Sequence, residues 1–166
     1  VFVDGIYAPQ LSSLESLPPG VTVLNLSEAM AIKSDHVRQH LARHAGYQEN
    51  AFVALNTAFV HDGAFVHIPD GAVVESPIHL LYISTARRED VVSHPRALVV
   101  TGKESSATII ESYGSLRDAR YLTNAVTELV VGSGSSVKYY KAQRQSQQAF
   151  HVTNTQVLLD RNSSFS

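Results

Sequence analysis

Apolar and polar positions recur with a fixed period toward the C-terminal end of this chain. Residues 99–110, 129–140 and 157–166 align without gaps and begin 30 and then 28 residues apart. Each stretch is a short apolar strand, a tight polar turn with two serines, and a second strand. Self-similarity of this size predicts a repeat architecture in which each unit buries its apolar face against its neighbours.

The second strand of each unit also keeps a common phase. Three apolar side chains share one position and three polar ones the next: Ala107, Val137 and Phe165, then Thr108, Lys138 and Ser166. Strands stacked about 4.8 Å apart need this register, because a slip of one residue would invert every side chain. Glu111 and Lys141 then lie opposite each other as a favourable charge pair. The pattern predicts stacked parallel coils.

The first strand of each unit is apolar in both phases. Val99, Leu129 and Val157 share one face, whereas Val100 and its counterparts at 130 and 158 lie on the other. A strand that is apolar on both faces is usually covered on both. We expect the N-terminal region of the same chain, rather than a partner, to cover the outer face.

The first sixty residues predict a different kind of structure. Residues 1–7 suit a hairpin around Asp-Gly, and residues 21–26 suit a strand. We expect a helix from an N-cap at Ser27 to about Ala45, with a second short helix ending near Val60. In that second helix, Phe52, Leu55 and Phe59 recur at helical spacing.

These patterns together predict a mainly β fold with two parts. Residues 1–50 form a small α/β region with a hairpin and a helix, and residues 51–166 form the start of a β-helix core. Because the last residues fall inside a strand pattern and the chain begins with Val1, we interpret it as a piece of a longer protein. We expect the edge of its last coil to be disordered, capped by another molecule, or paired in a homodimer.

Composition excludes several classes of function. The 166 residues carry a formal net charge of −2 and contain no cysteine, which excludes disulfides and thiolate chemistry within the sequence given. No basic excess indicates a nucleic acid partner, and no run of about 18 apolar residues indicates a membrane span.

Two patterns raise the question of a metal. His36, His40 and His44 are spaced four residues apart on the predicted helix, but the row drifts around the helix and lacks an accompanying carboxylate motif. We interpret it as a solvated helix flank. The segment from Gly63 nearly matches a cupin motif, but Val74 stands where that motif needs a histidine ligand.

The other candidate groups have simpler explanations. Ser135 and Lys138 have the spacing of a serine–lysine nucleophile pair, but the serine lies in a repeat turn. Gly132-Ser-Gly134 lacks the rest of a phosphate-binding loop. The remaining acids and histidines show no defining spacing: Glu75, Glu111, Glu128, His67, His79, His94 and His151. We therefore assign no catalytic, cofactor-binding or metal-binding residue.

The chain from Ala51 to Phe165 resembles the SufB/SufD family of the SUF iron–sulfur cluster assembly system, and SufD more than SufB. The resemblance is carried by Phe52–Ala58, Gly63–Pro69, Pro77–Leu81, Ser93–Arg96, Ala107–Tyr113, Tyr121–Glu128 and Gln148–Val152. The opening residues 1–12 also look like the part of SufD that precedes its core.

The resemblance implies a right-handed parallel β-helix and a non-catalytic scaffold role in a complex with SufB and the ATPase SufC. It implies that the complex handles the iron–sulfur cluster while this piece binds no cofactor, and that the SufC-binding segment lies after Ser166. The implied compartment is the bacterial cytoplasm, or the plastid stroma for a plant protein. The alternative is a metal-dependent enzyme on a cupin-like β frame.

Overall fold

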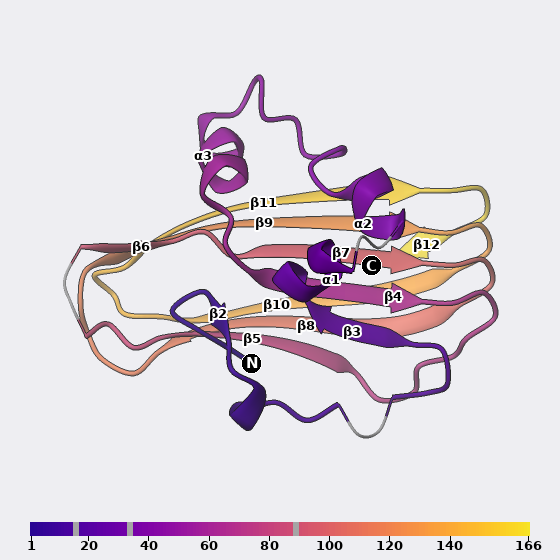
Figure 1. Cartoon of the computed structure of the whole chain (residues 1–166), viewed down its shortest axis with the longest axis horizontal. Coiled ribbons are helices and arrows are strands. Elements are labelled where there is room, and N and C mark those ends of the chain that lie inside the picture. Colours follow the sequence, from indigo (N-terminus) through magenta and orange to yellow (C-terminus); the bar gives the residue numbers. More distant parts are fainter. Residues whose placement is uncertain (15–16, 33–34, 88–89) are drawn as a thin grey trace.

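Two facing sheets form the body of the protein (Figure 1). The computed structural model describes residues 1–14, 17–32, 35–87 and 90–166. The first sheet contains, in spatial order, β12 (Ser164–Phe165), β10 (Ser136–Arg144), β8 (Ser106–Ser115), β5 (Ile78–Ser84), β1 (Phe2–Val3) and β2 (Ile6–Tyr7). The second contains β11 (Phe150–Leu159), β9 (Tyr121–Val131), β7 (Arg96–Thr101), β4 (Gly63–Ile68) and β3 (Thr22–Asn25), with β6 (Val91–Ser93) also paired to β9.

The chain winds between these sheets as a parallel β-helix of about three turns. It passes from β4 to β5, from β7 to β8, from β9 to β10 and from β11 to β12, and each coil pairs in parallel with the next. Val137 pairs with Ala107 on one side and with Phe165 on the other, and Lys141 pairs with Glu111. The register predicted from the repeats is confirmed.

The serine-rich turns stack by hydrogen bonding along the axis. The Ser135 hydroxyl donates to the carbonyl oxygen of Gly102 at 2.6 Å and accepts the backbone N–H of Ser105 at 2.9 Å. Gly132 lies so close to Gly102 that an added Cβ would be 2.3 Å from its carbonyl oxygen. The repeated serines and glycines are therefore explained by the contacts between neighbouring turns.

The N-terminal region covers the outer face of the second sheet, as predicted. Helices α1 (Leu26–Ala31) and α2 (Asp35–His40) lie over β4 and β7 (Figure 1). Leu26 and Val37 pack with Val100 in one buried apolar cluster, and Val130 lies at its edge. The cover ends before the last coil, where Leu158 is 47% exposed.

The prediction of one helix from Ser27 to Ala45 is wrong at both ends. The N-cap is Asn25, whose side chain accepts the backbone N–H of Glu28, and residues 33–34 of the predicted helix lie outside the described residues. After His40 the chain turns, with Ala42 at a φ of 57°. The backbone N–H groups of Ala42, His44 and Ala45 donate to the buried carboxylate of Glu128, which replaces helical hydrogen bonding there.

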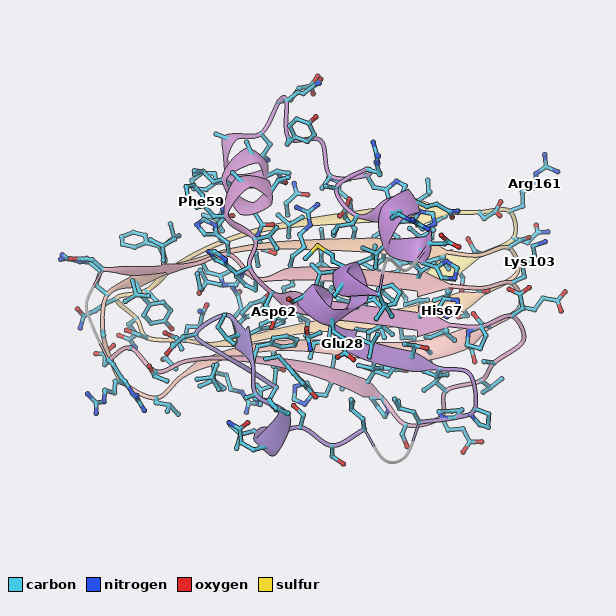
Figure 2. The ribbon with its side chains drawn as sticks, in the orientation of Figure 1. Glu28, Phe59, Asp62, His67, Lys103 and Arg161 are labelled. Carbon is cyan, nitrogen blue, oxygen red and sulfur yellow. The ribbon has the colours of Figure 1, made fainter. Side chains whose placement is uncertain are left out.

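The opening hairpin is confirmed and is tied to the rest of the chain by Asp62. Strands β1 and β2 pair antiparallel around Asp4 and Gly5, both at positive φ, and the 3₁₀ helix η1 (Pro9–Leu11) follows. The Asp62 carboxylate accepts backbone N–H groups from Tyr7, Ser27 and Gly63 (Figure 2 shows its central place). One side chain thus joins the hairpin, α1 and β4.

The second predicted helix is present as α3 (Ala51–Phe59), but it buries a different face from the expected one. Val53 and Asn56 are buried, whereas Phe52, Leu55 and Phe59 are between 43% and 54% exposed. The helix is short and its inner face is anchored by Asn56 to polar backbone groups, so the apolar row points outward. Among the described residues, no helix is both long enough and apolar enough to cross a membrane.

Asn50→Ala should destabilise the protein by about 0.5–2 kcal/mol. The Asn50 side chain caps α3 by accepting the backbone N–H groups of Phe52 and Val53 at 3.0 and 3.1 Å, and alanine has no acceptor to replace it. Urea unfolding monitored by circular dichroism measures the change. Gln48→Ala, at an exposed position before the helix, is the matched control and should leave the midpoint unchanged.

Candidate functional site

The interior of the β-helix has an apolar half and a polar half. Along β8, every second side chain points inward, and these are Ala107 and Ile109 followed by Glu111 and Tyr113. The apolar half fills with aliphatic side chains from all coils, including Val66, Val99, Leu129 and Val137. The polar half is therefore the part of the interior that contains titratable and hydrogen-bonding side chains.

Glu111 is the centre of the polar half and is fully buried. Its carboxylate accepts hydrogen bonds from the hydroxyls of Tyr113 and Tyr139 and, at 2.9 Å, from that of Thr127. The Lys141 ammonium lies 3.5 Å from the same carboxylate. Because the donors come from β8, β9 and β10, one buried charge connects two successive coils. Its oxygens are occupied by donors, which does not suit a general base.

The tyrosines of this cluster are held in their neutral form. Burial raises the pKa of Tyr113 well above its usual range, and the neighbouring Glu111 carboxylate raises it further. The pKa of Tyr139 is raised by the same two causes in the same order. Neutral hydroxyls can donate hydrogen bonds, so both tyrosines occupy the oxygens of the Glu111 carboxylate as donors.

Several polar atoms near this cluster have no hydrogen-bond partner among the described residues. They are the hydroxyls of Tyr82 and Tyr121 and both ring nitrogens of His151. The His151 ring meets Tyr113 edge-on with 4.6 Å between centroids. Burial, followed by the nearby Lys141 charge, lowers the pKa of His151, which favours a neutral imidazole. This part of the interior thus offers neutral donors and acceptors of hydrogen bonds.

Tyr113→Phe should destabilise the protein by about 1.5–3 kcal/mol, because it removes a hydrogen bond to a buried charge. Tyr82→Phe is the matched control: its ring stacks on Tyr113 with 5.0 Å between centroids, but its buried hydroxyl has no described partner. We expect the control to be neutral or stabilising, measured as the urea midpoint. Equal losses in both variants would contradict the role given to Glu111.

A second polar cluster joins the N-terminal region to the coils. Glu128, on β9, is fully buried, and its carboxylate is 2.6 Å from the Arg96 guanidinium. It also accepts the backbone N–H groups of Ala42, His44 and Ala45 at 2.9–3.0 Å. Burial raises the pKa of Glu128, but the Arg96 charge and these hydrogen bonds outweigh it and hold the pKa below its usual range.

Asn56 extends this cluster to α3. Its amide donates to the carbonyl oxygens of Pro95 and Asn124 at 2.9 and 2.8 Å, and its own oxygen accepts from Arg96 at 3.1 Å. Thr57 accepts a further hydrogen bond from Arg96. The cluster therefore fixes both the loop after α2 and the helix α3 against the second sheet.

Most residues considered as catalytic candidates lie in turns, in the apolar core or on the surface and do not form a catalytic site. Ser135 is buried in the turn ladder, whereas Lys138 points to solvent, so the two do not form a nucleophile pair. Gly134 adopts a positive φ in the same turn. Val74 is buried in the apolar core where a cupin would carry a ligand. Glu75 is exposed to solvent, whereas Glu111 and Glu128 are buried.

The histidines separate into pairs and single contacts. His36 stacks on His67 with 4.1 Å between ring centroids, and His40 Nδ1 lies 3.1 Å from His44 Nε2. The three predicted flank histidines are therefore not one solvated row. Ordinary side-chain hydrogen bonds hold His79, with Ser112 at 2.9 Å, and His94, with Asn124 at 3.2 Å, whereas His151 has none among the described residues.

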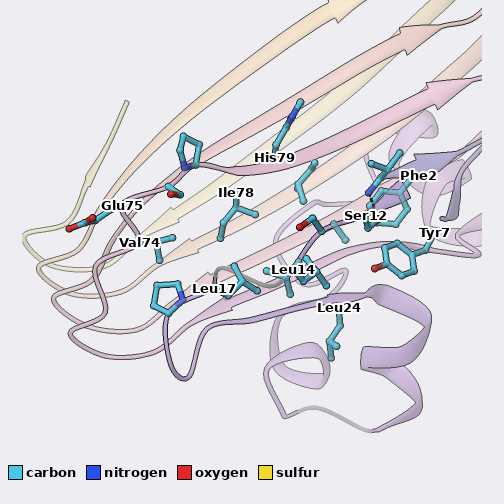
Figure 3. Close-up of a pocket in the computed structure, with 18 of the residues that line it drawn as sticks. Phe2, Tyr7, Ser12, Leu14, Leu17, Leu24, Val74, Glu75, Ile78 and His79 are labelled. Carbon is cyan, nitrogen blue, oxygen red and sulfur yellow. Dashed lines mark hydrogen bonds between the residues drawn. The ribbon is translucent and has the colours of Figure 1, made fainter. Parts of the chain in front are cut away.

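Two hollows lie outside the polar interior. A cavity of about 400 Å³ opens between the N-terminal segment and the first coil, lined mainly by apolar side chains such as Phe2, Leu17 and Ile78 (Figure 3). A groove of about 520 Å³ runs between Phe59 of α3 and Val92, at the end of the coils opposite Lys103 and Arg161 (Figure 2 labels Phe59, Lys103 and Arg161). The groove has four titratable side chains in its lining: Asp4, His61, Asp62 and His94. Both aspartates already accept structural hydrogen bonds, Asp4 from Thr85 and Asp62 from three backbone N–H groups. Within the described residues, no group of three or more His, Cys, Asp or Glu side chains can hold a metal ion.

Sequence reasoning missed Arg96 and Asn56 and gave Glu128 no role. Glu128 carried a usable signal, since it is the one charged residue in a strand that is apolar on both faces. Its position on the outer face, which was expected to be covered, indicated a buried carboxylate in need of a cation. Nothing local pointed to Asn56, whose partners lie 39 and 68 residues away.

Comparison with known proteins identifies both parts of the chain. The profile of the SufBD protein N-terminal region matches residues 1–80, and that of the SUF system FeS cluster assembly SufBD core domain matches residues 82–166. The division predicted at residue 50 stays a prediction.

The matched relatives include both branches of the family. The chain is 32% identical to an iron–sulfur cluster assembly SufBD family protein of Synechocystis sp., over 95% of this chain and 36% of the relative. It is 24% identical to SufB of Bacillus subtilis, over 86% and 30%, and 29% identical to SufD of the same organism, over 76% and 29%. It thus spans about a third of the length of the curated relatives it matches.

Proposed function

Because this chain belongs to the SufBD family of iron–sulfur cluster assembly proteins, we propose that it is a non-catalytic scaffold of a SufBCD-type complex. The observation that carries the proposal is the β-helix interior. The buried acid cluster around Glu111 is closed by tyrosine and threonine hydroxyls that hold the coils together. A rigid, internally bonded frame of this kind suits protein contacts better than turnover.

Within the family we propose the SufD role, with a SufB protein and the ATPase SufC as partners. The opening segment and the passage from α3 into the coils support SufD, while the relatives include SufB as well. The sequence given contains no cysteine, and iron–sulfur clusters are normally held by thiolates. The iron–sulfur cluster is accordingly the cargo of the complex. The proposed compartment is the bacterial cytoplasm or the plastid stroma.

Co-expression of the full-length protein with the SufB and SufC of the same organism tests this proposal. We expect the three proteins to elute together from a sizing column, and light scattering of the same preparation reports whether two copies of this chain pair instead. A folded full-length protein that binds neither SufB nor SufC would refute the scaffold role. A stable complex with SufC in which it replaces SufB would refute the SufD assignment alone.

The metal-dependent enzyme is not supported. A cupin needs several ligands converging on one point, whereas the described residues provide no group of three. Val74 occupies the core in place of the histidine that the motif requires.

A further inference from the structure

His40 and His44 meet nitrogen to nitrogen rather than face to face. Their nearest ring nitrogens, Nδ1 of His40 and Nε2 of His44, are 3.1 Å apart, and the ring planes differ by 29°. The centroids are 5.4 Å apart, which exceeds the nitrogen separation by about one ring radius on each side. The two rings therefore point at each other almost in line, with the N–H of one ring directed at the lone pair of the other. An ion that binds between them takes both lone pairs once the donating ring changes tautomer and carries its proton on its other nitrogen.

The loop after α2, which carries His44, is held in place by hydrogen bonds to Glu128. The backbone N–H of His44 donates to Glu128 at 2.9 Å, and those of Ala42 and Ala45 donate to the same carboxylate. Arg96 holds that carboxylate in turn at 2.6 Å. Ligands whose support is anchored in this way are preorganised, since the loop need not be ordered when an ion binds.

His40 is also favoured in the chemical form that binds metals. Both rings are half-buried. Burial lowers the pKa of His40, and the neighbouring His44 and His36 lower it further, against the opposing influence of Glu128. A neutral imidazole is the ligand form of histidine.

The geometry points to a two-coordinate site for a soft monovalent cation, Cu(I) or its analogue Ag(I), between His40 and His44. Two nitrogens in line match the linear coordination that these d¹⁰ ions accept, whereas zinc needs four ligands at tetrahedral angles. Among the described residues, no third His, Cys, Asp or Glu joins the pair. Metal–imidazole bonds of about 2.0 Å require the nitrogens to separate by less than about 1 Å. His40, the last residue of α2, is placed to allow that movement. The site is independent of the scaffold function.

Titration of the protein with silver nitrate in chloride-free buffer tests the site. We expect one Ag(I) per chain, with the ¹⁵N resonances of His40 Nδ1 and His44 Nε2 shifting together. His40→Ala or His44→Ala should each weaken binding by at least about a hundredfold, more than is typical for loss of a supporting residue. His79→Ala, which removes an exposed histidine on β5, should leave the affinity unchanged.

Two further readouts make the inference falsifiable. X-ray absorption of the Cu(I)-loaded protein should show two nitrogen ligands, and the wild-type nitrogen shifts serve even if an alanine variant fails to fold. Binding that survives loss of both histidines, a three- or four-coordinate ion, or tighter binding of Zn(II) than of Cu(I) would each overturn it.

Discussion

Gly63→Ala should separate the first coil from the second and destabilise the protein by more than about 3 kcal/mol, the upper range for overpacking. An added Cβ at Gly63 would lie 1.8 Å from the carbonyl oxygen of Arg96 and 2.8 Å from its carbonyl carbon. Both atoms are backbone, so no side-chain rotation relieves the clash. Gly63 pairs with Arg96 at the start of β4 and β7, beside the cluster around Glu128.

Soluble yield and the urea midpoint measure this effect, and Gly46→Ala is its matched control. No heavy atom lies within 4 Å of a Cβ added at Gly46, and its φ is not positive. We expect that variant to be unchanged or stabilised by about 0.4–1 kcal/mol through the unfolded state. Similar midpoints for the two variants would contradict the stacking described for β4 and β7.

The β-helix was predictable because its constraints repeat along the chain. Ala107, Val137 and Phe165 occupy equivalent positions in successive coils, and each lies beside the next at the spacing of a parallel sheet. A slip in register would have appeared in the sequence as apolar residues aligned with polar ones. The outer cover was predictable for the same reason, since Val100 and Val130 required burial.

The N-terminal region was less predictable because its contacts are long in sequence and do not repeat. The end of α2 is decided by Glu128, which lies more than 80 residues from the backbone groups it accepts. The orientation of α3 is decided by Asn56. Because Asn56 is polar, a search for apolar residues at helical spacing does not identify it as part of the buried face. Local patterns therefore placed both helical segments but gave neither the end of the first nor the buried face of the second.

The polar half of the interior shows the same limit. The pairing of Glu111 with Lys141 was predicted from the repeat offset, and the structure shows that Glu111 also points inward from β8. Its closest partners are nevertheless hydroxyls of Tyr113, Tyr139 and Thr127, which no charge pattern indicates. Repeat register predicts which strands neighbour one another, whereas which side chains meet across the interior depends on how the two sheets face each other.

Glu128→Gln should destabilise the protein by about 3–5 kcal/mol, because it leaves the Arg96 charge buried without its partner. Arg96 is 1% exposed, so water does not replace the lost carboxylate. The amide also has only one oxygen to accept the three N–H groups of the loop after α2. Urea unfolding measures the loss, and amide hydrogen exchange of residues 42–45 should accelerate in the variant. Asp90→Asn, which breaks the exposed ion pair with Arg120, is the matched control and should not shift the midpoint.

Acid should reproduce part of this loss in the unmodified protein. The pKa of Glu128 is lower in the folded state than in the unfolded chain, where the pKa of glutamate is about 4.3. A lowered folded-state pKa means that the stabilisation is complete above about pH 4.3 and disappears as pH falls through the folded value. The unfolding free energy of the wild type should therefore decrease more steeply below about pH 4.3 than that of Glu128→Gln. Parallel curves for the two proteins would show that the carboxylate of Glu128 does not hold the N-terminal region to the coils.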